Sequence, residues 1–309
     1  MGLVIKPGLA GCKSGLNAVT PLREPMGVVV RQWKFYNIRN VLNSKQLKKY
    51  IKGILPMKYI RFSKNDEVMY GIIEGETITR LNGDFMSGEA QPLDETFSLG
   101  DVRTLPPVMP GQVVGIGLNY ALHAEETGKP LPEEPMMFMV SPTSIIGDGD
   151  KITLPTLEHR IDYEVELTIV IGKQAHKVKK GDALSYVFGY TISNDISDRD
   201  LQQKDGQYTR AKSYATFKPL GPVIETELDP DNVQLKTTVN GEVRQHSNTN
   251  DLIHDVRSII ETVTDVMTLN PGDIIITGTP SGVGPLQPGD EIVMEIQGIG
   301  TLRNSVSAE

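Results

Sequence analysis

Short runs of alternating apolar and polar residues recur along the chain from Met57 onward, a pattern typical of β-strands. Polar or glycine-containing turns such as Ser63–Asp66 separate these runs. The Asn240-Gly241 pair favours a tight hairpin. The runs that we predict as strands are Lys58–Phe62, Val68–Ile73, Thr77–Leu81, Gln112–Gly117, Glu164–Ile171, Val187–Ser193, Gly221–Ile224, Val233–Asn240, Asp273–Thr277 and Glu291–Ile296.

One segment has the helical period instead. Its apolar residues recur about every 3.6 positions between Asn250 and Met267, and Asp251 lies where a capping residue is expected. The chain lacks the regular alternation of strands and helices that characterises Rossmann folds and TIM barrels. The sequence therefore predicts an α+β fold that is rich in strands.

Composition divides the chain into three parts. Residues 57–104 hold the first three predicted strands and are expected to form a small N-terminal β domain. The proline-rich segment Leu105–Pro110 then leads into a larger domain, residues 105–309, which carries the candidate chemistry described below.

Residues 1–56 form a basic N-terminal extension. They hold ten lysines and arginines against one acidic residue, Glu24, so their net charge is +9 and the rest of the chain carries −17. Three interpretations compete: an organelle-targeting peptide, a basic helical arm around Ser44–Ile54, or translated sequence upstream of a native start at Met57. We favour the third, and a peptide spanning residues 40–56 in the natural protein would contradict it.

Overall composition limits the classes of function. The net charge of −8 argues against nucleic acid as the main partner, because nucleic-acid-binding proteins concentrate lysine and arginine. No run approaches the roughly 18 apolar residues of a membrane span. Cys12 is the only cysteine, so the chain cannot form an internal disulfide or a cysteine-based metal cluster. We expect a cytoplasmic protein.

Two glutamates lie two positions apart in the predicted strand Glu164–Ile171. Successive side chains of a strand point to opposite faces, so Glu164 and Glu166 point to the same face. Two adjacent carboxylates repel each other, and Mg²⁺ or Mn²⁺ relieves that repulsion with the oxygen ligands it prefers. The pattern fits a metal site, with a solvated strand face as the alternative.

A second polar group follows the predicted strand Val187–Ser193. We expect a helix to begin near Asn194 or Asp195. Asp195, Arg199 and Gln202 then share one face of that helix at positions i, i+4 and i+7. A carboxylate, a guanidinium and an amide together suit a metal and an anionic ligand. The alternative is that Asp195 caps an ordinary surface helix.

A histidine and a glutamate lie three positions apart after the predicted strand Gln112–Gly117. In a short helix His123 and Glu126 share a face, where the carboxylate orients the imidazole and raises its basicity. The next residues, Thr127–Pro135, are rich in proline, glycine and charge, as mobile lids are. The group suits a general base, with a surface His–Glu pair as the alternative.

Six sequence blocks occur in an order that resembles the fumarylacetoacetate hydrolase family. They read Asn-Tyr-x-x-His-x-x-Glu, Asp-Tyr-Glu-x-Glu, Asn-Asp-x-Ser-x-Arg-Asp-x-Gln, Lys-Ser-x-x-x-Phe-x-Pro-x-Gly-Pro, Val-Asn-Gly-Glu-x-Arg-Gln and Thr-Gly-Thr-Pro-x-Gly-Val-Gly. The match covers about residues 105–305, and residues 57–104 resemble the small N-terminal β unit of bacterial members. The resemblance implies a mixed β-roll that usually assembles as a homodimer.

The resemblance also assigns roles to residues. It implies that the catalytic domain, residues 105–309, binds Mg²⁺ or Mn²⁺ and a small 2-oxo or diketo acid. The implied metal ligands are Glu164, Glu166 and Asp195. The implied catalytic residues are His123, Glu126 and Lys212, and the implied substrate-binding residues are Arg199, Gln202 and Thr279. Tyr163, next to the metal ligands but on the opposite face, is expected in the core.

The chain departs from the family pattern in two places. Relatives commonly have lysine where this chain has Val140, and a valine neither donates a hydrogen bond nor carries charge. Relatives often have aspartate in place of Ala215 and no lysine at Lys218. Both departures bear more on the substrate than on the metal.

The implied chemistry is cleavage or proton transfer beside a metal-stabilised enolate. We predict hydrolysis of a C–C bond in an acylpyruvate-like acid. Decarboxylation of an oxaloacetate-type acid and isomerisation of a 2-hydroxymuconate-type acid are alternatives that use the same residues. A metal-binding relative without turnover is the alternative from another class.

Overall fold

The computed structural model describes residues 57–309, so the prediction for the basic N-terminal extension lies outside the described residues. Strands dominate the described chain, and they are β1 (Lys58–Lys64), β2 (Glu67–Glu74), β3 (Thr77–Leu81), β4 (Pro92–Ser98), β5 (Arg103–Leu105), β6 (Val113–Gly117), β7 (Met136–Val140), β8 (Ile145–Ile146), β9 (Lys151–Leu154), β10 (Ile161–Tyr163), β11 (Val165–Ile171), β12 (Val187–Asn194), β13 (Ser197–Asp198), β14 (Lys218–Glu225), β15 (Gln234–Val239), β16 (Glu242–Asn248), β17 (Ile274–Ile276), β18 (Gly284–Pro285), β19 (Glu291–Ile296) and β20 (Gly300–Ala308).

The helices are short and connect the strands. They are α3 (Ala121–Thr127), α4 (Arg199–Asp205), α5 (Thr209–Lys212), α6 (Val256–Val266) and the 3-10 helices η1 (Phe85–Ser87), η2 (Leu99–Asp101), η3 (Pro142–Ser144), η4 (Lys180–Tyr186) and η5 (Thr249–Asp251). None of the helices within residues 57–309 is long and apolar enough to cross a membrane.

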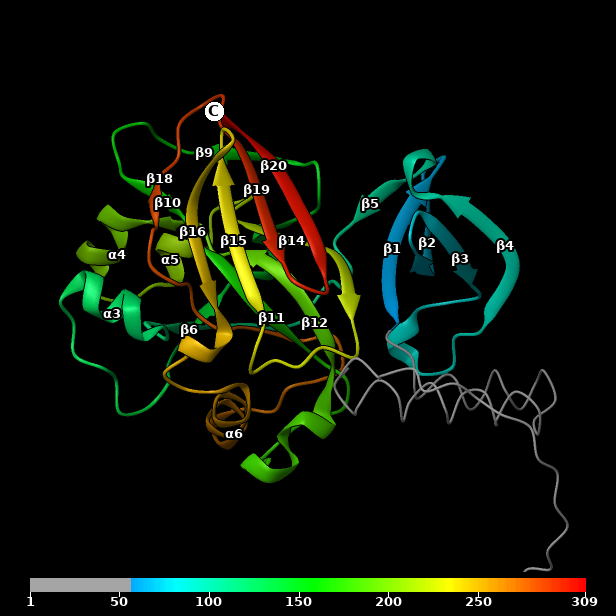
Figure 1. Ribbon diagram of the computed structural model, residues 1–309, viewed down its shortest axis with the longest axis horizontal. Coiled ribbons are helices and arrows are strands. Elements are labelled where there is room, and N and C mark those ends of the chain that lie inside the picture. The colour runs from blue at the N-terminus through cyan, green and yellow to red at the C-terminus, as the bar shows by residue number, and fades with distance from the viewer. Residues whose placement is uncertain (1–56) are drawn as a thin grey trace, which may run out of the picture. The chain divides into compact units, whose positions relative to one another are not determined.

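The larger sheet has twelve strands, ten of them in the order β4-β3-β2-β1-β14-β12-β11-β17-β6-β7, while β5 pairs with β1 and β8 with β14 (Figure 1). Its pairs are antiparallel except β17 with β6 and β14 with β8. The first strands join the rest where Lys58 and Tyr59 of β1 pair with Glu225 and Ile224 of β14. Residues 57–104 therefore extend the same sheet that carries the candidate site.

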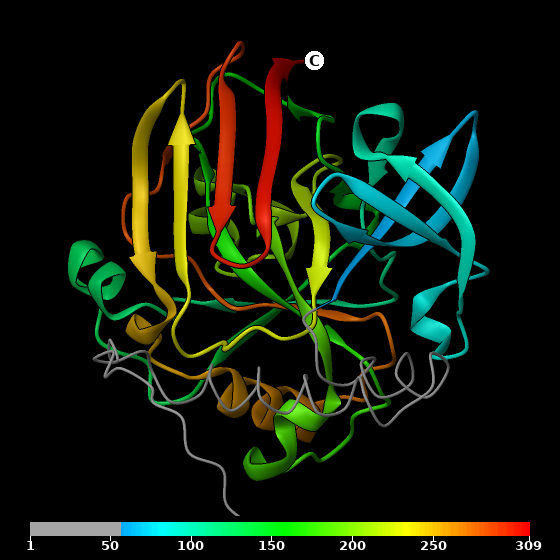
Figure 2. The same cartoon turned by 45° about the vertical axis from the view of Figure 1, so that its right-hand side comes forward.

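A second sheet has five strands in the order β16-β15-β19-β20-β9, and Figure 2 shows its two hairpins side by side. Asn240 and Gly241 both have positive φ, at 52° and 83°, which the two-residue hairpin turn between β15 and β16 requires. The hairpin predicted from this dipeptide is confirmed. A small third sheet, β13-β10-β18, lies next to the candidate site.

The core lies between the two larger sheets. β11, β12 and β14 pack against β15, β19 and β20, and their inward residues are almost all apolar. Ile169 and Ile192 of the larger sheet and Met294 of the smaller one belong to this one buried cluster. α6 covers the same cluster through Ile259 and Ile260. The predicted strand-rich α+β roll is confirmed.

The predicted helix Asn250–Met267 is too long. α6 begins at Val256, where Asp255 caps it by accepting a hydrogen bond from the Ser258 amide at 2.8 Å. Leu252 and Ile253 instead pair with the Asn119–Tyr120 segment, since Leu252 forms a β-bridge with Tyr120. The apolar residues before Asp255 thus follow the helical period while serving a tertiary contact.

Candidate active site

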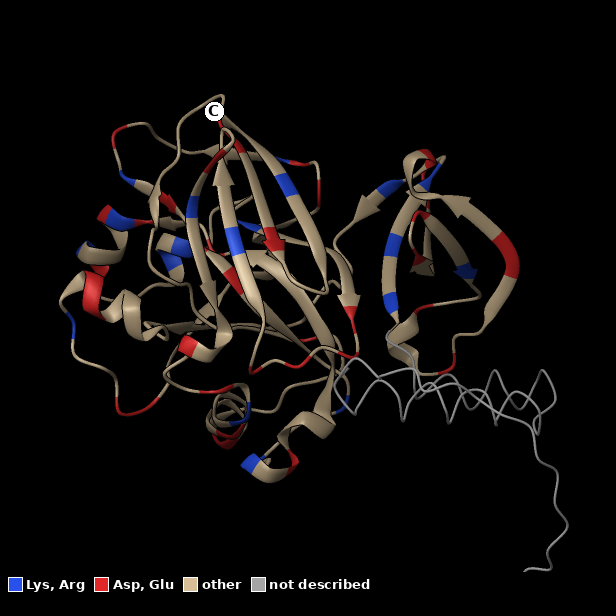
Figure 3. Ribbon diagram, viewed as in Figure 1, with Lys and Arg blue, Asp and Glu red and all other residues tan. Residues whose placement is uncertain are grey.

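A pocket of about 320 Å³ opens where β6, β10 and β11 meet α3, α4 and α5. Figure 3 shows basic and acidic residues close together on α4 and α5 at this side of the molecule. The predicted site residues that line the pocket are His123, Glu164, Glu166, Arg199, Gln202, Lys212 and Thr279. Glu126 and Asp195 stand directly behind them, bonded to His123 and Lys212. The structure thus brings all the predicted residues together.

The three acidic residues converge from two neighbouring strands. Glu166 belongs to β11, Glu164 fills the single-residue break before that strand, and Asp195 follows β12. β11 and β12 are antiparallel, and the Asp195 amide donates to the Glu164 carbonyl at 2.9 Å. One carboxylate oxygen from each residue lies within 4.8 Å of the others, and all three side chains are buried.

Two cations neutralise Glu164. Lys212 Nζ lies 2.8 Å from Glu164 Oε2 and also bonds Asp195, while Arg199 Nη2 lies 2.5 Å from Glu164 Oε1. Burial raises the pKa of Glu164, but Arg199 and Lys212 outweigh burial and lower that pKa to about 2. Glu164 is therefore ionised at neutral pH.

Glu166 lacks such a partner. Burial first, then the charges of Asp195 and Glu164, raise the pKa of Glu166 well above its ordinary value. The Gly278 amide donates to Glu166 Oε2 at 2.6 Å. Gly278 has a φ of 98°, and a Cβ there would lie 2.7 Å from Asn119 Cβ, so only glycine fits.

Asp195 is left with an unsatisfied oxygen. Lys218 Nζ lies 2.8 Å from Asp195 Oδ1, but it donates to the carbonyl oxygens of Ile196, Phe217 and Lys212 at 3.2, 2.9 and 2.7 Å. Within residues 57–309, Asp195 Oδ1 is buried and accepts no hydrogen bond. This oxygen and the carboxyl of Glu166, which forms no ion pair in the described part of the chain, fit a divalent cation with oxygen ligands. Glu164, Glu166 and Asp195 are the residues that would hold it.

The helix predicted to begin near Asn194 or Asp195 begins four or five residues later, at Arg199. Ser197 and Asp198 pair with β10 in extended conformation, and the Asp198 side chain caps α4 by accepting from the Leu201 amide at 3.0 Å. Arg199 and Gln202 do share a face, with Nη1 donating to Oε1 at 2.9 Å. Asp195 reaches the site from the preceding loop.

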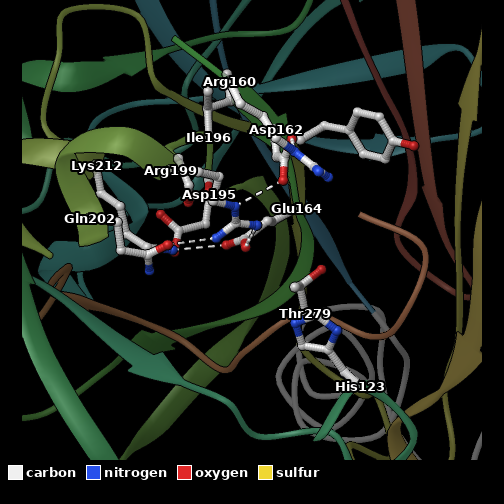
Figure 4. A network of polar contacts seen from close by, with 12 residues as sticks. His123, Arg160, Asp162, Glu164, Asp195, Ile196, Arg199, Gln202, Lys212 and Thr279 are labelled. Atoms are coloured by element: carbon white, nitrogen blue, oxygen red, sulfur yellow. Dashed lines mark hydrogen bonds and ion pairs between the residues drawn. The ribbon is translucent and has the colours of Figure 1, made fainter. Parts of the chain in front are cut away.

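The predicted dyad lies across the pocket from the three acids, on α3, and Figure 4 shows His123 apart from their cluster. His123 Nδ1 and Glu126 Oε2 are 2.8 Å apart. The Gly282 amide donates to the same carboxylate at 3.2 Å, which ties α3 to the glycine-rich segment 277–284. The His–Glu pair predicted from sequence is therefore present and faces the pocket.

Thr279 lines the pocket, yet its hydroxyl is already engaged. It donates to the Val165 carbonyl at 3.0 Å and accepts from Gln245 Nε2 at 2.9 Å. Its role toward a ligand stays a prediction. Tyr163 is in the core as expected, 4% exposed, with its hydroxyl donating to the Gly282 carbonyl at 3.2 Å.

The two family departures fall outside the pocket wall. Val140 is 2% exposed in an apolar cluster with Val108 and Val113, so it belongs to the interior of the fold and does not line the pocket. Ala215 is exposed, whereas Lys218 is buried behind Asp195. Of these positions only Lys218 adds a charge next to the candidate metal ligands.

Sequence reasoning missed three residues that build the site. Asp162 accepts from Arg199 and Arg160, and Arg160 lines the pocket. Asn119 is fully buried and bridges the carbonyls of His254 and Thr277 at 3.1 and 2.8 Å. Asp162 and Asn119 lie inside the quoted sequence blocks and could have been found there, but Arg160 carries no local signal.

Comparisons with known proteins agree with this geometry. Residues 112–307 match the family model described as fumarylacetoacetate (FAA) hydrolase C-terminal, and residues 57–107 match the Rv2993c-like N-terminal model. Protein Rv2993c of Mycobacterium tuberculosis is 42% identical over 81% of this chain and 98% of its own length.

Two further proteins are similar over much of the chain. Bovine mitochondrial oxaloacetate tautomerase FAHD2A is 37% identical over 82% of this chain and 80% of its own length. The crystal structure of 5-carboxymethyl-2-hydroxymuconate delta-isomerase from Mycobacterium smegmatis is 42% identical with a TM-score of 0.77, over 82% of this chain and 100% of that one.

Proposed function

This chain belongs to the fumarylacetoacetate hydrolase family and is an enzyme of that family, and we propose that it moves protons on a small 2-oxo acid as a divalent-metal-dependent tautomerase or isomerase. The observation that carries the proposal is the placement of the His123–Glu126 pair across one pocket from a buried acidic triad. A base and a cation site on opposite walls suit proton transfer next to a carbonyl.

Mg²⁺ or Mn²⁺, when bound, supplies the Lewis acidity that stabilises enolate charge on a 2-oxo acid. His123 supplies the base. Because Glu126 accepts from Nδ1 at 2.8 Å, that nitrogen carries the hydrogen and Nε2 is left to take and return a proton. Glu126 in turn is held by the Gly282 amide, so the imidazole keeps its direction.

The opposite wall binds and orients the substrate. Gln202 accepts from Arg199 with its oxygen, which turns its amide N–H groups toward the ligand. Lys212 is buried between Glu164 and Asp195, and these two charges outweigh burial and raise its pKa, so its ammonium stays charged. A fixed positive charge at this point favours the developing enolate.

Tautomerase or isomerase activity is favoured over hydrolysis because the oxaloacetate tautomerase and the delta-isomerase are similar to this chain over most of its length. The C–C hydrolysis favoured from sequence is the second candidate. The His123–Glu126 pair supports it, since Glu126 is 43% exposed and the imidazole can activate water there. Hydrolysis consumes one water and converts an acylpyruvate into pyruvate and a second acid, whereas tautomerisation keeps the carbon chain intact.

The test compares the purified full chain with and without Mg²⁺ or Mn²⁺. We expect the metal-loaded protein to accelerate enol–keto exchange of oxaloacetate, followed by ultraviolet absorbance, and Glu166→Gln to abolish that acceleration. Glu95→Gln, on exposed β4, is the matched control and should behave as the parent. Pyruvate release from acetylpyruvate without tautomerisation would favour the hydrolase, and no turnover of either acid would overturn both proposed activities.

We also propose that two copies of the chain pair through β7. This strand ends the larger sheet, and among the described strands only β6 pairs with it. Met136 and Met139 are 42% and 37% exposed, and an apolar edge without charged residues is usually covered. Light scattering should give twice the 34.0 kDa chain mass, and Met139→Lys should lower it; a parent at the single-chain mass would contradict the pairing.

A further inference from the structure

Arg160 stands at the mouth of the pocket on a rigid backbone. Its amide donates to Asp200 Oδ2 at 2.8 Å, and its carbonyl accepts from the Arg199 amide at 2.8 Å. The first turn of α4 therefore holds Arg160 on both sides. The residue lines the same pocket as the acidic triad, although its side chain is 56% exposed.

The guanidinium of Arg160 is fixed at one point only. Its Nε donates to Asp162 Oδ1 at 2.8 Å, while Arg199 Nε donates to Asp162 Oδ2 at the same distance. Asp162 is 1% exposed, so one buried carboxylate orients two arginines, as Figure 4 shows. Arg199 continues inward to Glu164, whereas the Nη groups of Arg160 donate to no residue within 57–309.

Arg160 shares its one carboxylate partner with another cation. Asp162 pairs with both Arg160 and Arg199, whereas Lys212 pairs with Glu164 and Asp195, so no carboxylate within residues 57–309 is held by Arg160 alone. A planar guanidinium held at Nε presents its Nη hydrogens as a fork, and such a fork fits a carboxylate with two parallel hydrogen bonds. Lys129, also on the pocket wall, adds a second exposed cation.

We propose that Arg160 determines specificity for a second carboxylate, at the end of the substrate far from the acidic triad. The favoured substrate is then a 2-oxo diacid whose 2-oxo end faces the triad and whose distal carboxylate binds the Arg160 fork. This inference rests on the proposed function, because it places the 2-oxo group at the triad. A 2-oxo monoacid loses the Arg160 interaction and binds more weakly.

The test pairs each diacid with its monomethyl ester, which lacks the distal negative charge and carries one additional methyl group. Kinetics use oxaloacetate and its distal monomethyl ester, and calorimetry on the Mn²⁺-loaded full chain uses 2-oxoadipate and its distal monomethyl ester. We expect Arg160→Gln to raise KM and Kd for the diacids about tenfold, to change the ester values less than about twofold, and to change kcat less than about threefold. Arg160→Lys keeps the charge without the fork and should recover part of the diacid preference.

Arg103→Gln is the matched control, because Arg103 is also an exposed arginine with one carboxylate partner, Asp150 at 2.7 Å, and lies outside the pocket. It should leave all four ligands unchanged. Equal weakening of diacid and ester by Arg160→Gln, or no weakening of either, would overturn the specificity role. Loss of the diacid preference in calorimetry without any turnover by the parent would support the Arg160 role while the proposed function fails.

Discussion

The acidic side of the pocket is buried and heavily bonded, whereas the histidine side lies on a short exposed helix. Glu164, Glu166 and Asp195 are each less than 5% exposed, and Lys212 and Lys218 are buried with them. On the histidine side, Glu126 is 43% exposed and α3 has only seven residues. One wall is part of the core of the fold, and the other is attached to its surface.

The two sides of the pocket therefore differ in whether a substitution affects the stability of the fold as well as the activity. Glu164 and Asp195 are compensated by Arg199, Lys212 and Lys218, so removal of one of these partners leaves another charge without compensation. On the histidine side Glu126 is 43% exposed, so solvent replaces a partner that Glu126 loses at little cost. We therefore expect substitutions on the acidic side to affect stability, metal binding and activity together, and substitutions on the histidine side to affect activity alone.

Glu164→Ala should give the largest effect. It leaves partly buried Arg199 and buried Lys212 without their shared carboxylate, so we expect a loss of about 3–5 kcal/mol in unfolding free energy and more than about 100-fold in Mn²⁺ affinity. Chemical denaturation and calorimetry measure these quantities, and Glu164→Gln serves if the alanine variant does not fold. Full Mn²⁺ affinity in both variants would show that Glu164 is not a metal ligand.

His123→Gln should lower the activity without weakening metal binding. We expect kcat for enol–keto exchange to fall by about 10²–10⁴, because the general base is lost. Mn²⁺ affinity should stay at the parent value, since His123 lies apart from the acidic cluster. The unfolding free energy should fall by about 1 kcal/mol or less, because Glu126, the partner that His123 leaves behind, is 43% exposed. A parallel loss of Mn²⁺ affinity would mean that the two walls are coupled and would break the comparison.

Lys218→Met should distinguish two roles of Lys218: the hydrogen bonds that it donates to buried carbonyl oxygens, and the positive charge that it places beside Asp195. Three buried carbonyl oxygens lose their donor, so we expect a loss of about 2–4 kcal/mol in unfolding free energy. Removal of a positive charge beside Asp195 should also tighten Mn²⁺ binding, by up to about tenfold. Lys236→Met, which breaks an exposed pair with Glu295, is the control and should cost about 1 kcal/mol or less. Weaker Mn²⁺ binding in a folded Lys218→Met would contradict the electrostatic argument.

The smallest expected effect is a change with pH in the stability that the His159–Asp198 pair contributes at the edge of the acidic side. His159 Nδ1 lies 2.7 Å from buried Asp198, and this hydrogen bond is the main cause that raises the pKa of His159. Because the folded pKa lies above the unfolded value of about 6.5, the stabilisation is fully present below that value and is lost as pH rises through the folded pKa. The difference in Tm between the parent and His159→Gln should therefore be larger at pH 5 than at pH 9, and a constant difference would rule out the charged pair.

Much of the fold could be read from local pattern. The β15–β16 hairpin followed from Asn240-Gly241, and the buried strand β11 followed from its continuous apolar run. The first residue of α6 could not be predicted from the sequence, because Leu252 and Ile253 fit the helical period although they pair with the Asn119–Tyr120 segment. The start of α4 was missed for the same reason, since β13 is held extended by β10.

Some residues of the candidate site could likewise be predicted from the sequence, and others could not. Glu164, Glu166 and the His123–Glu126 pair were predictable because their partners lie two or three positions away, within one local period. Arg160 was not predictable, because its orientation depends on Asp162 and on the α4 turn at Asp200.

The sequence by itself determined the strand-rich fold, the paired glutamates and the histidine dyad, since each depends on spacing along one element. Only the tertiary structure decided that β12 brings Asp195 to Glu164, that Lys218 is buried behind the triad, and that Arg160 faces the pocket. Those placements depend on how antiparallel strands align and on which charges a buried carboxylate holds, and neither is encoded within a short stretch of residues.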